Sequence, residues 1–184
     1  PDAGECLWRC RPIGKMREDF HADLLYIGHL NGVKDDLSAF ENVRIASRLG
    51  SFEAYPDEIE RALGLVGLQD FVHHTTGELS QGQRRRVALA RLFVSIAKPL
   101  WILDEPFTAL DAASVANLAH AIGTQVEAGG LVVYTTHQEC PIDVPDYARK
   151  TLDVSAYAPA GEDPAPGEDG EDGIIDFFGR KIIH

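Results

Sequence analysis

One eleven-residue run, WILDEPFTALD at residues 101–111, constrains the fold of this 184-residue chain more than any other feature. Apolar residues lead directly into Asp104 and Glu105, and a proline then breaks the extended backbone. A buried strand that ends in two carboxylates presents them at the carboxyl edge of a sheet, where open α/β folds bind ligands. The run therefore predicts an α/β domain with an acidic site, in which Asp104 suits Mg²⁺ and Glu105 suits a water that must be polarised.

A second motif, LSQGQ at residues 79–83, opens a predicted helix. Apolar residues recur after it at helical spacing and form one stripe: Leu89, Leu92, Phe93 and Ile96. The start of such a helix offers free backbone N–H groups, a positive dipole end and the hydroxyl of Ser80, and Gly82 lets an anion approach the backbone. Ser80 to Gln83 therefore form a candidate phosphate site. The plainer alternative is a helix that Ser80 only caps.

Three arginines, Arg84, Arg85 and Arg86, follow this motif and raise the question of a nucleic-acid partner. The net charge of the chain is −12, and residues 153–176 hold eight acidic residues and no Lys or Arg, which leaves −4 on the rest. On an amphipathic helix in an acidic chain, we expect the arginines to form a solvated or phosphate-facing flank. Charge gives no case for nucleic-acid binding.

A βαβ unit follows the acidic run. Strands are predicted near residues 100–104 and 131–136, and a helix at 112–128 lies between them, which implies parallel strands. Asp111 is placed to cap this helix. His137 ends the second strand, where its imidazole could reach a phosphate, although a single histidine at a strand end is more often structural.

The preceding part of the sequence predicts one further buried strand and a helical insertion. Residues 24–28 are apolar and predict the strand. Ser38 and Glu41 have the spacing of a capping box that opens a helix to about Leu49, and Pro56 opens another helix that closes at Gly67. We therefore expect a helical subdomain at about residues 38–78.

The three motifs, in this order, resemble the signature motif, the Walker B motif with its D-loop, and the H-loop of ATP-binding cassette (ABC) ATPases. The resemblance implies a P-loop NTPase-like ABC nucleotide-binding domain, with a parallel sheet and a helical subdomain, that binds ATP and Mg²⁺. It further implies that Asp104 holds the metal, that Glu105 is the general base and that His137 contacts the γ-phosphate. It also implies a set of residues that bind nucleotide at a dimer interface: Ser80, Gln81, Gly82, Gln83 and Asp111.

The residues around the first predicted strand point to one subfamily of ABC domains. Most ABC domains place a Gln after this strand, where it ligates Mg²⁺ and senses the γ-phosphate, and this chain has His29 at that position. Residues 25–39 (LYIGHLNGVKDDLSA) and 135–138 (TTHQ) resemble the ABC subfamily of bacterial haem exporters that act in cytochrome c maturation.

This resemblance implies a homodimer through the ATP sites, bound to membrane-spanning transporter subunits of the cytochrome c maturation system. It places the protein peripherally on the cytoplasmic face of the bacterial inner membrane, and no apolar run in the sequence approaches membrane-spanning length. The ATPase subunit of another ABC exporter is the alternative that remains open.

The sequence contains no phosphate loop of the form Gly-x-x-x-x-Gly-Lys-Ser/Thr, because Gly14-Lys15 lacks both the spacing and the hydroxyl. Residues 1–8 resemble the part of ABC domains that follows this loop. We therefore expect an ABC domain at residues 1–153 that lacks its phosphate-loop part, so that this chain alone binds ATP poorly and the ATPase is the complete gene product. A truncated, non-catalytic ABC module is the alternative.

The last part of the chain has a different composition. Prolines, glycines and acidic residues dominate it, so residues 154–184 are expected to form a disordered tail. The apolar end, residues 174–184, either docks on the body or on a partner, or has no functional role.

Overall fold

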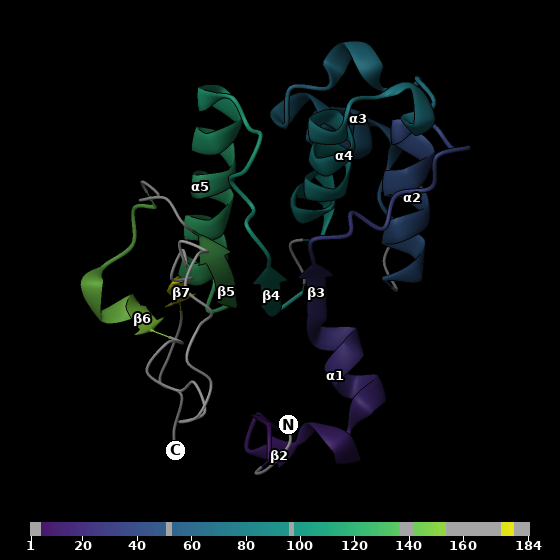
Figure 1. Ribbon diagram of the computed structural model, residues 1–184. Coiled ribbons are helices and arrows are strands. Elements are labelled where there is room, and N and C mark those ends of the chain that lie inside the picture. The colour runs from purple at the N-terminus through teal and green to yellow at the C-terminus, as the bar shows by residue number, and fades with distance from the viewer. Residues whose placement is uncertain (1–4, 51–52, 96–97, 137–141, 154–173, 179–184) are drawn as a thin grey trace, which may run out of the picture.

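The computed structural model describes residues 5–50, 53–95, 98–136, 142–153 and 174–178. At its centre is a five-stranded sheet with the strand order β3-β4-β5-β7-β6 (Figure 1). The strands are β3 (Leu24–Ile27), β4 (Leu100–Leu103), β5 (Leu131–Thr136), β6 (Arg149–Asp153) and β7 (Ile174–Phe178). Strands β3, β4 and β5 are parallel, as predicted, and β7 is antiparallel to both β5 and β6.

Five α-helices are present among the described residues, and the four that Ser38, Pro56, Ser80 and Asp111 predict begin at or directly after those residues. They are α1 (Arg17–Asp23), α2 (Ala39–Leu49), α3 (Pro56–Leu65), α4 (Gln81–Val94) and α5 (Ala112–Glu127). The capping box of α2 is present, since Ser38 Oγ accepts the N–H of Glu41 at 3.2 Å and the Glu41 carboxylate accepts the N–H of Ser38 at 2.9 Å. Pro56 is the first residue of α3.

Short elements complete the described chain. A hairpin of β1 (Leu7–Trp8) and β2 (Arg11–Pro12) precedes α1. Four 3₁₀ turns are present among the described residues: Ile13–Lys15, Gln69–Phe71, Thr76–Glu78 and Asp146–Ala148. Figure 1 shows the hairpin and α1 at one end of the molecule, below the strands.

Two helical layers surround the strands. Helices α2, α3 and α4 pack on one another and gather beyond the carboxyl end of β3, whereas α5 packs beside β5 (Figure 1). The core joins these layers, and its residues Leu89, Leu92, Trp101, Leu118 and Ile122 are at most 1% exposed. The predicted stripe of α4 therefore faces the core as expected, although the helix ends at Val94, and Ile96 lies outside the described residues.

Strand β7 differs from the expectation of a disordered tail. Residues 174–178 form regular backbone pairs with β5 on one side and with β6 on the other. Two isoleucines and two phenylalanines in five residues favour an extended backbone, and β5 provides a strand to pair with. The expectation of disorder does not hold for these five residues, whereas residues 154–173 and 179–184 lie outside the described chain.

Candidate active site

The two adjacent carboxylates stand at the carboxyl edge of the sheet, at the end of β4. The N–H of Asp104 donates to the carbonyl of Ile27 at 2.8 Å, which extends the pairing with β3 by one residue. Glu105 then has φ of +44°, in the left-handed region that residues with a Cβ rarely adopt. The chain therefore leaves the sheet abruptly at Glu105, and both carboxylate side chains are partly exposed at this corner.

Thr135 on β5 joins the two acidic residues. Its hydroxyl donates to Oδ1 of Asp104 at 2.7 Å and accepts the N–H of Glu105 at 2.9 Å. The parallel register pairs Leu103 with Tyr134, so that Asp104 and Thr135 follow side by side. Sequence reasoning missed Thr135, and the available signal was that two parallel strands end together at one edge of the sheet.

The start of α4 is a capped helix end. Ser80 Oγ accepts the N–H of Gln83 at 3.2 Å, and the side-chain oxygen of Gln83 accepts the N–H of Ser80 at 2.9 Å. Ser80 and Gln81 are exposed. Ser80 therefore caps α4, and a contact of the same hydroxyl with phosphate stays a prediction.

Gly82 lies against the turn that follows the acidic corner. A Cβ at Gly82 would stand 3.3 Å from the Cβ of Ala109, and Ala109 has φ of +61°. The glycine thus allows the segment after Glu105 to approach the start of α4 closely. This close approach brings the signature residues and the acidic corner into one region of the molecule.

Arg85 ties three loops together at this region. Its guanidinium donates to the carbonyl of Gly28, to the side-chain oxygen of Asn31 at 3.3 Å and to the carbonyl of Asp104. Burial lowers the pKa of Arg85, and the carboxylates of Asp104 and Glu105 partly oppose this effect.

The expectation that all three arginines are solvated or face phosphate is therefore wrong for Arg85, which is only 9% exposed. The physical reason is its position four residues before Leu89, on the same buried stripe of α4. The helical spacing contained this signal, because Arg85 extends the stripe by one turn.

The neighbouring arginines make ion pairs instead. Arg84 lies 3.3 Å from the carboxylate of Asp35, and Arg86 lies 3.6 Å from that of Asp111. Asp111 also accepts the N–H of Ser114 at 2.8 Å, which confirms the predicted cap of α5. This hydrogen bond, together with Arg86, holds the pKa of Asp111 below its usual range. Asp111 is thus linked to the signature helix within one subunit.

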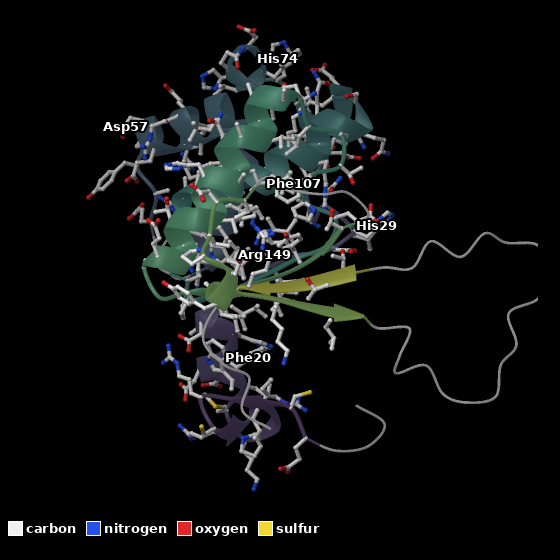
Figure 2. All side chains as sticks on the ribbon, turned by 90° about the vertical axis from the view of Figure 1, so that its left-hand side faces the viewer. Phe20, His29, Asp57, His74, Phe107 and Arg149 are labelled. Carbon is white, nitrogen blue, oxygen red and sulfur yellow. The ribbon has the colours of Figure 1, made fainter. Side chains whose placement is uncertain are left out.

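Of the two predicted site histidines, only His29 lies among the described residues. His29 is exposed in the loop after β3, and its neighbours Gly28 and Asn31 both accept hydrogen bonds from Arg85. Figure 2 shows His29 at the level of Phe107, between the helical layer around His74 and the end that carries Phe20. His137 lies outside the described residues. The structure therefore brings the His29 loop, Asp104 and the start of α4 together through Arg85.

The donor set at the corner fits a magnesium ion held mainly by other ligands. Among the described residues, no group of three or more His, Cys, Asp and Glu side chains surrounds a common point. Mg²⁺ commonly takes one or two carboxylates and fills its octahedron with water and phosphate oxygens. Oδ1 of Asp104 is bound to Thr135, whereas Oδ2 has no hydrogen bond to the described chain and is available to such an ion.

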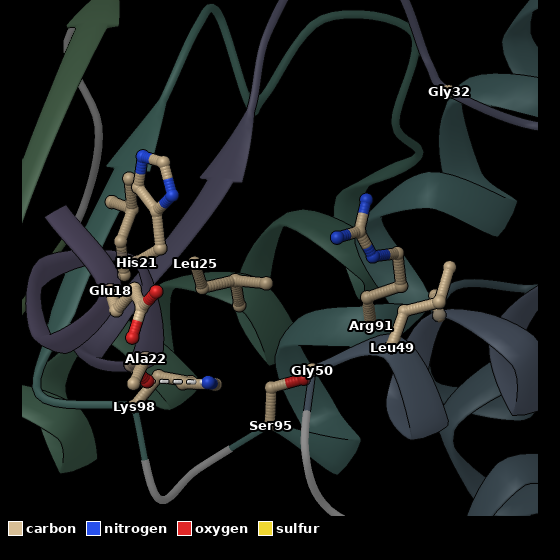
Figure 3. A pocket seen from close by; sticks show the side chains of 12 residues that line it. Glu18, His21, Ala22, Leu25, Gly32, Leu49, Gly50, Arg91, Ser95 and Lys98 are labelled. Atoms are coloured by element: carbon tan, nitrogen blue, oxygen red, sulfur yellow. Dashed lines mark hydrogen bonds between the residues drawn. The ribbon is translucent and has the colours of Figure 1, made fainter.

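A cavity of about 540 Å³ lies apart from this corner (Figure 3). Figure 3 shows Glu18 and His21 on one side of it and Leu49 and Arg91 on the other, with Leu25 between them. The cavity therefore separates α1 and β3 from α2 and α4. Lys98 lines its base and donates from its ammonium group to the carbonyl of Ala22.

Comparison with known proteins agrees with this architecture. The model of the ABC transporter family matches residues 1–108. The chain therefore belongs to the ABC transporter family.

Within this family, the chain is similar to proteins named cytochrome c biogenesis ATP-binding export protein CcmA. It is 48% identical to CcmA of Aromatoleum aromaticum over 158 residues, which cover 86% of this chain and 72% of that protein. It is 44% identical to CcmA of Escherichia coli strain K12 over 144 residues, or 78% of this chain and 66% of that protein.

Solved structures show the same fold. An ABC transporter ATP-binding protein of Pyrococcus furiosus superposes with a TM-score of 0.61 at 26% identity, over 76% of this chain and 66% of that one. The ATP-binding cassette MJ0796, solved with ADP and Pi, superposes with a TM-score of 0.58 at 19% identity, over 73% of this chain and 69% of that one. The chain thus has the fold of an ABC ATPase domain.

Proposed function

We propose that this chain is the catalytic part of the ATP-hydrolysing subunit of an ABC transporter complex for cytochrome c biogenesis, which powers haem export or its release to a periplasmic chaperone. The observation that carries the proposal is the Asp104–Glu105 corner, fixed at the carboxyl edge of the sheet beside the start of α4. The names of the similar proteins from A. aromaticum and E. coli support the choice of cytochrome c biogenesis.

In the proposed reaction, Glu105 accepts the proton of the attacking water, and Asp104 offers Oδ2 to Mg²⁺. When bound, the ion would offset the negative charge of the phosphates, and most of the catalysis is positioning and charge stabilisation. His137 is proposed to contact the γ-phosphate, and His29 to take the place of the usual Gln. The hydrogen bonds that hold Asp104 and Glu105 support this division of roles, because they leave one carboxylate oxygen of Asp104 available.

We further propose a head-to-tail homodimer in which each ATP lies between two subunits. Ser80, Gln81, Gly82 and Gln83 would bind the ATP held by the other subunit, at the positive end of the α4 dipole. Asp111 would lie at the same interface. Exposure supports this proposal, since Ser80, Gln81 and Asp111 all face solvent in the single chain.

The proposed membrane partner would dock on the cavity between the sheet and the helical layer. Leu49 borders this cavity and is 82% exposed, and Ile45 lies one helical turn away and is 42% exposed. Neighbouring exposed apolar side chains beside a cavity favour contact with another protein. None of the described helices is both long and apolar enough to cross a bilayer. The likeness to the CcmA proteins supports our proposal of a peripheral position on the cytoplasmic face of the bacterial inner membrane, bound to membrane-spanning subunits of the cytochrome c maturation system.

Residues 1–184 alone are proposed to bind ATP weakly, because the sequence contains no Gly-x-x-x-x-Gly-Lys-Ser/Thr motif. The second candidate is a non-catalytic ABC module that binds partners only. Failure of the complete gene product to bind ATP would support this second candidate.

The cellular experiment replaces the native gene by a Glu105→Gln variant and measures haem attached to c-type cytochromes. We expect attachment to be lost while the variant protein accumulates normally and co-purifies with membrane subunits of cytochrome c maturation. Normal haem attachment would refute the proposed role in cytochrome c biogenesis. Co-purification with an unrelated permease would instead indicate another ABC exporter.

A further inference from the structure

The hydroxyl of Thr135 forms hydrogen bonds with both acidic residues of the corner, with the side chain of Asp104 and with the backbone of Glu105. A threonine hydroxyl has one proton to donate and two lone pairs that accept. Its proton goes to Oδ1 of Asp104, and one lone pair accepts the N–H of Glu105. A single side chain thus holds two consecutive residues at once.

The bond to Thr135 completes the fixing of Asp104. The N–H of Asp104 is bound to β3 and its carbonyl to Arg85 of α4, so that Thr135 of β5 adds a third element. The hydrogen bond to Oδ1 is short at 2.7 Å and charge-assisted, so it restricts rotation of the Asp104 carboxylate about the Cβ–Cγ bond. The ligand oxygen of Asp104 is therefore held in one place.

The bond from Glu105 to Thr135 acts on the backbone. Glu105 has the left-handed φ of +44°, which persists in a residue with a Cβ only where neighbouring groups hold it. The direction in which the Glu105 side chain leaves the backbone depends on this conformation. Because Thr135 accepts the Glu105 N–H, it helps to fix the direction in which the Glu105 side chain leaves the backbone.

The strand conformation of β5 does not require a hydroxyl at position 135. Strand β5 has the sequence LVVYTT, and a valine in place of Thr135 would suit the extended backbone equally and would fill the same space. It would nevertheless leave the Glu105 N–H and Oδ1 of Asp104 without this partner. The chemistry of the hydroxyl, and not the packing of the strand, is what the corner uses.

We propose that Thr135 is a positioning residue for ATP hydrolysis, one that fixes the metal-binding carboxylate of Asp104 and the backbone of the general base Glu105. The proposal rests on the proposed ATPase function. Thr135 itself touches neither nucleotide nor water in the reaction and acts through its two bonds.

The first test uses the complete gene product and needs no ATP. Amide hydrogen exchange at Glu105 is compared in wild type, Thr135→Val and Thr135→Ser, with Thr124→Val on the exposed face of α5 as the matched control. We expect exchange at Glu105 to become at least about tenfold faster in Thr135→Val only, because its acceptor is lost. Unchanged exchange in Thr135→Val would overturn the proposal.

The second test measures ATP hydrolysis by the complete gene product carrying the same substitutions. Loss of a residue that orients a metal ligand typically lowers activity 10- to 100-fold, so we expect a fall of about this size in kcat for Thr135→Val. KM for ATP should change by less than about threefold, and Thr135→Ser should restore kcat, since the hydroxyl returns.

The outcomes separate the two proposals. A Thr135→Val protein with normal kcat, or a Thr135→Ser protein as impaired as Thr135→Val, would overturn the positioning role. A wild-type product that hydrolyses no ATP would instead refute the proposed function, and the exchange measurement would still decide whether Thr135 holds the corner.

Discussion

Replacement of Asp111 tests the link between the acidic run and the helix that follows it. Asp111 caps α5 through the N–H of Ser114 at 2.8 Å, and its carboxylate lies 3.6 Å from Arg86. Loss of an Asp cap typically lowers the free energy of unfolding by about 1 kcal/mol. The ion pair adds only about 0–1 kcal/mol, because the Asp111 side chain is 55% exposed and water screens it.

We therefore expect Asp111→Ala to lower the free energy of unfolding by about 1–2 kcal/mol, in the range of the cap and the ion pair together. For a chain of this size, this corresponds to a fall in Tm of roughly 2–8 °C. Asp111→Asn keeps the acceptor and loses the charge, so it should lose about half as much or less. Urea unfolding followed by circular dichroism measures both variants, with exposed Asp36→Ala as the control that should lie within about 0.5 kcal/mol of wild type.

The pH dependence has a definite sign. Hydrogen bonding to Ser114 and the neighbouring Arg86 hold the pKa of Asp111 below its value in the unfolded chain, which is about 3.9. The ionised carboxylate therefore stabilises the fold fully above about pH 4, and this contribution disappears as the pH falls through the lower, folded-state pKa. The stability difference between wild type and Asp111→Ala should be constant near pH 7 and shrink below pH 4. Equal stability of the two proteins at pH 7 would refute the reasoning.

Four further substitutions, at three residues, test the region around α4. Arg85→Met removes three hydrogen bonds to buried or partly buried acceptors and should cost about 2–4 kcal/mol of stability. Arg84 is partly exposed and bonds the carbonyls of Leu79 and Gly77, which water can reach, so Arg84→Met should cost only about 1 kcal/mol. Equal losses in urea unfolding would contradict the burial of Arg85. Ser80→Ala should lose about 1 kcal/mol of helix capping and also weaken the ATP-bound dimer. Ser80→Asp keeps the cap but places a negative charge towards phosphate, so it should unfold like wild type and yet fail to dimerise with ATP in sedimentation velocity. ATP-dependent dimerisation of Ser80→Asp at the wild-type level would leave Ser80 as a cap only.

Local rules predicted most of the fold because the decisive signals lie close together in the sequence. Capping residues Ser38, Ser80 and Asp111 marked three helix starts, since each bonds an N–H only three residues ahead. The apolar strands before Asp104 and His137 predicted a parallel pair, because a helix that connects two strands of one sheet lets both strands run in the same direction.

Contacts between distant segments were beyond such rules. Arg85 finds its acceptors 57 and 19 residues away, at Gly28 and Asp104, and nothing in the local pattern names these partners. Thr135 lies 31 residues from Asp104, and their contact follows only from the strand register. Strand β7 was missed because its acidic, proline-rich surroundings have the composition of a disordered segment.

The candidate site divides along the same line. Asp104 and Glu105 could be predicted from the sequence, because their residue type and their position at a strand end define the chemistry. The structure adds Thr135 and Arg85, which hold these two residues in place. Positioning residues are hard to see in one sequence, because a threonine in a strand or an arginine on a helix is common in many other settings.

The most direct test of the central claim is the rate of ATP hydrolysis by the complete gene product with and without Glu105→Gln, together with ATP binding by both proteins. Loss of a general base lowers the rate by about 10²- to 10⁴-fold, and binding should persist because the substitution keeps the shape of the side chain. Binding with hydrolysis abolished is the predicted result. Hydrolysis by Glu105→Gln at the wild-type rate would contradict the claim that this corner carries the reaction.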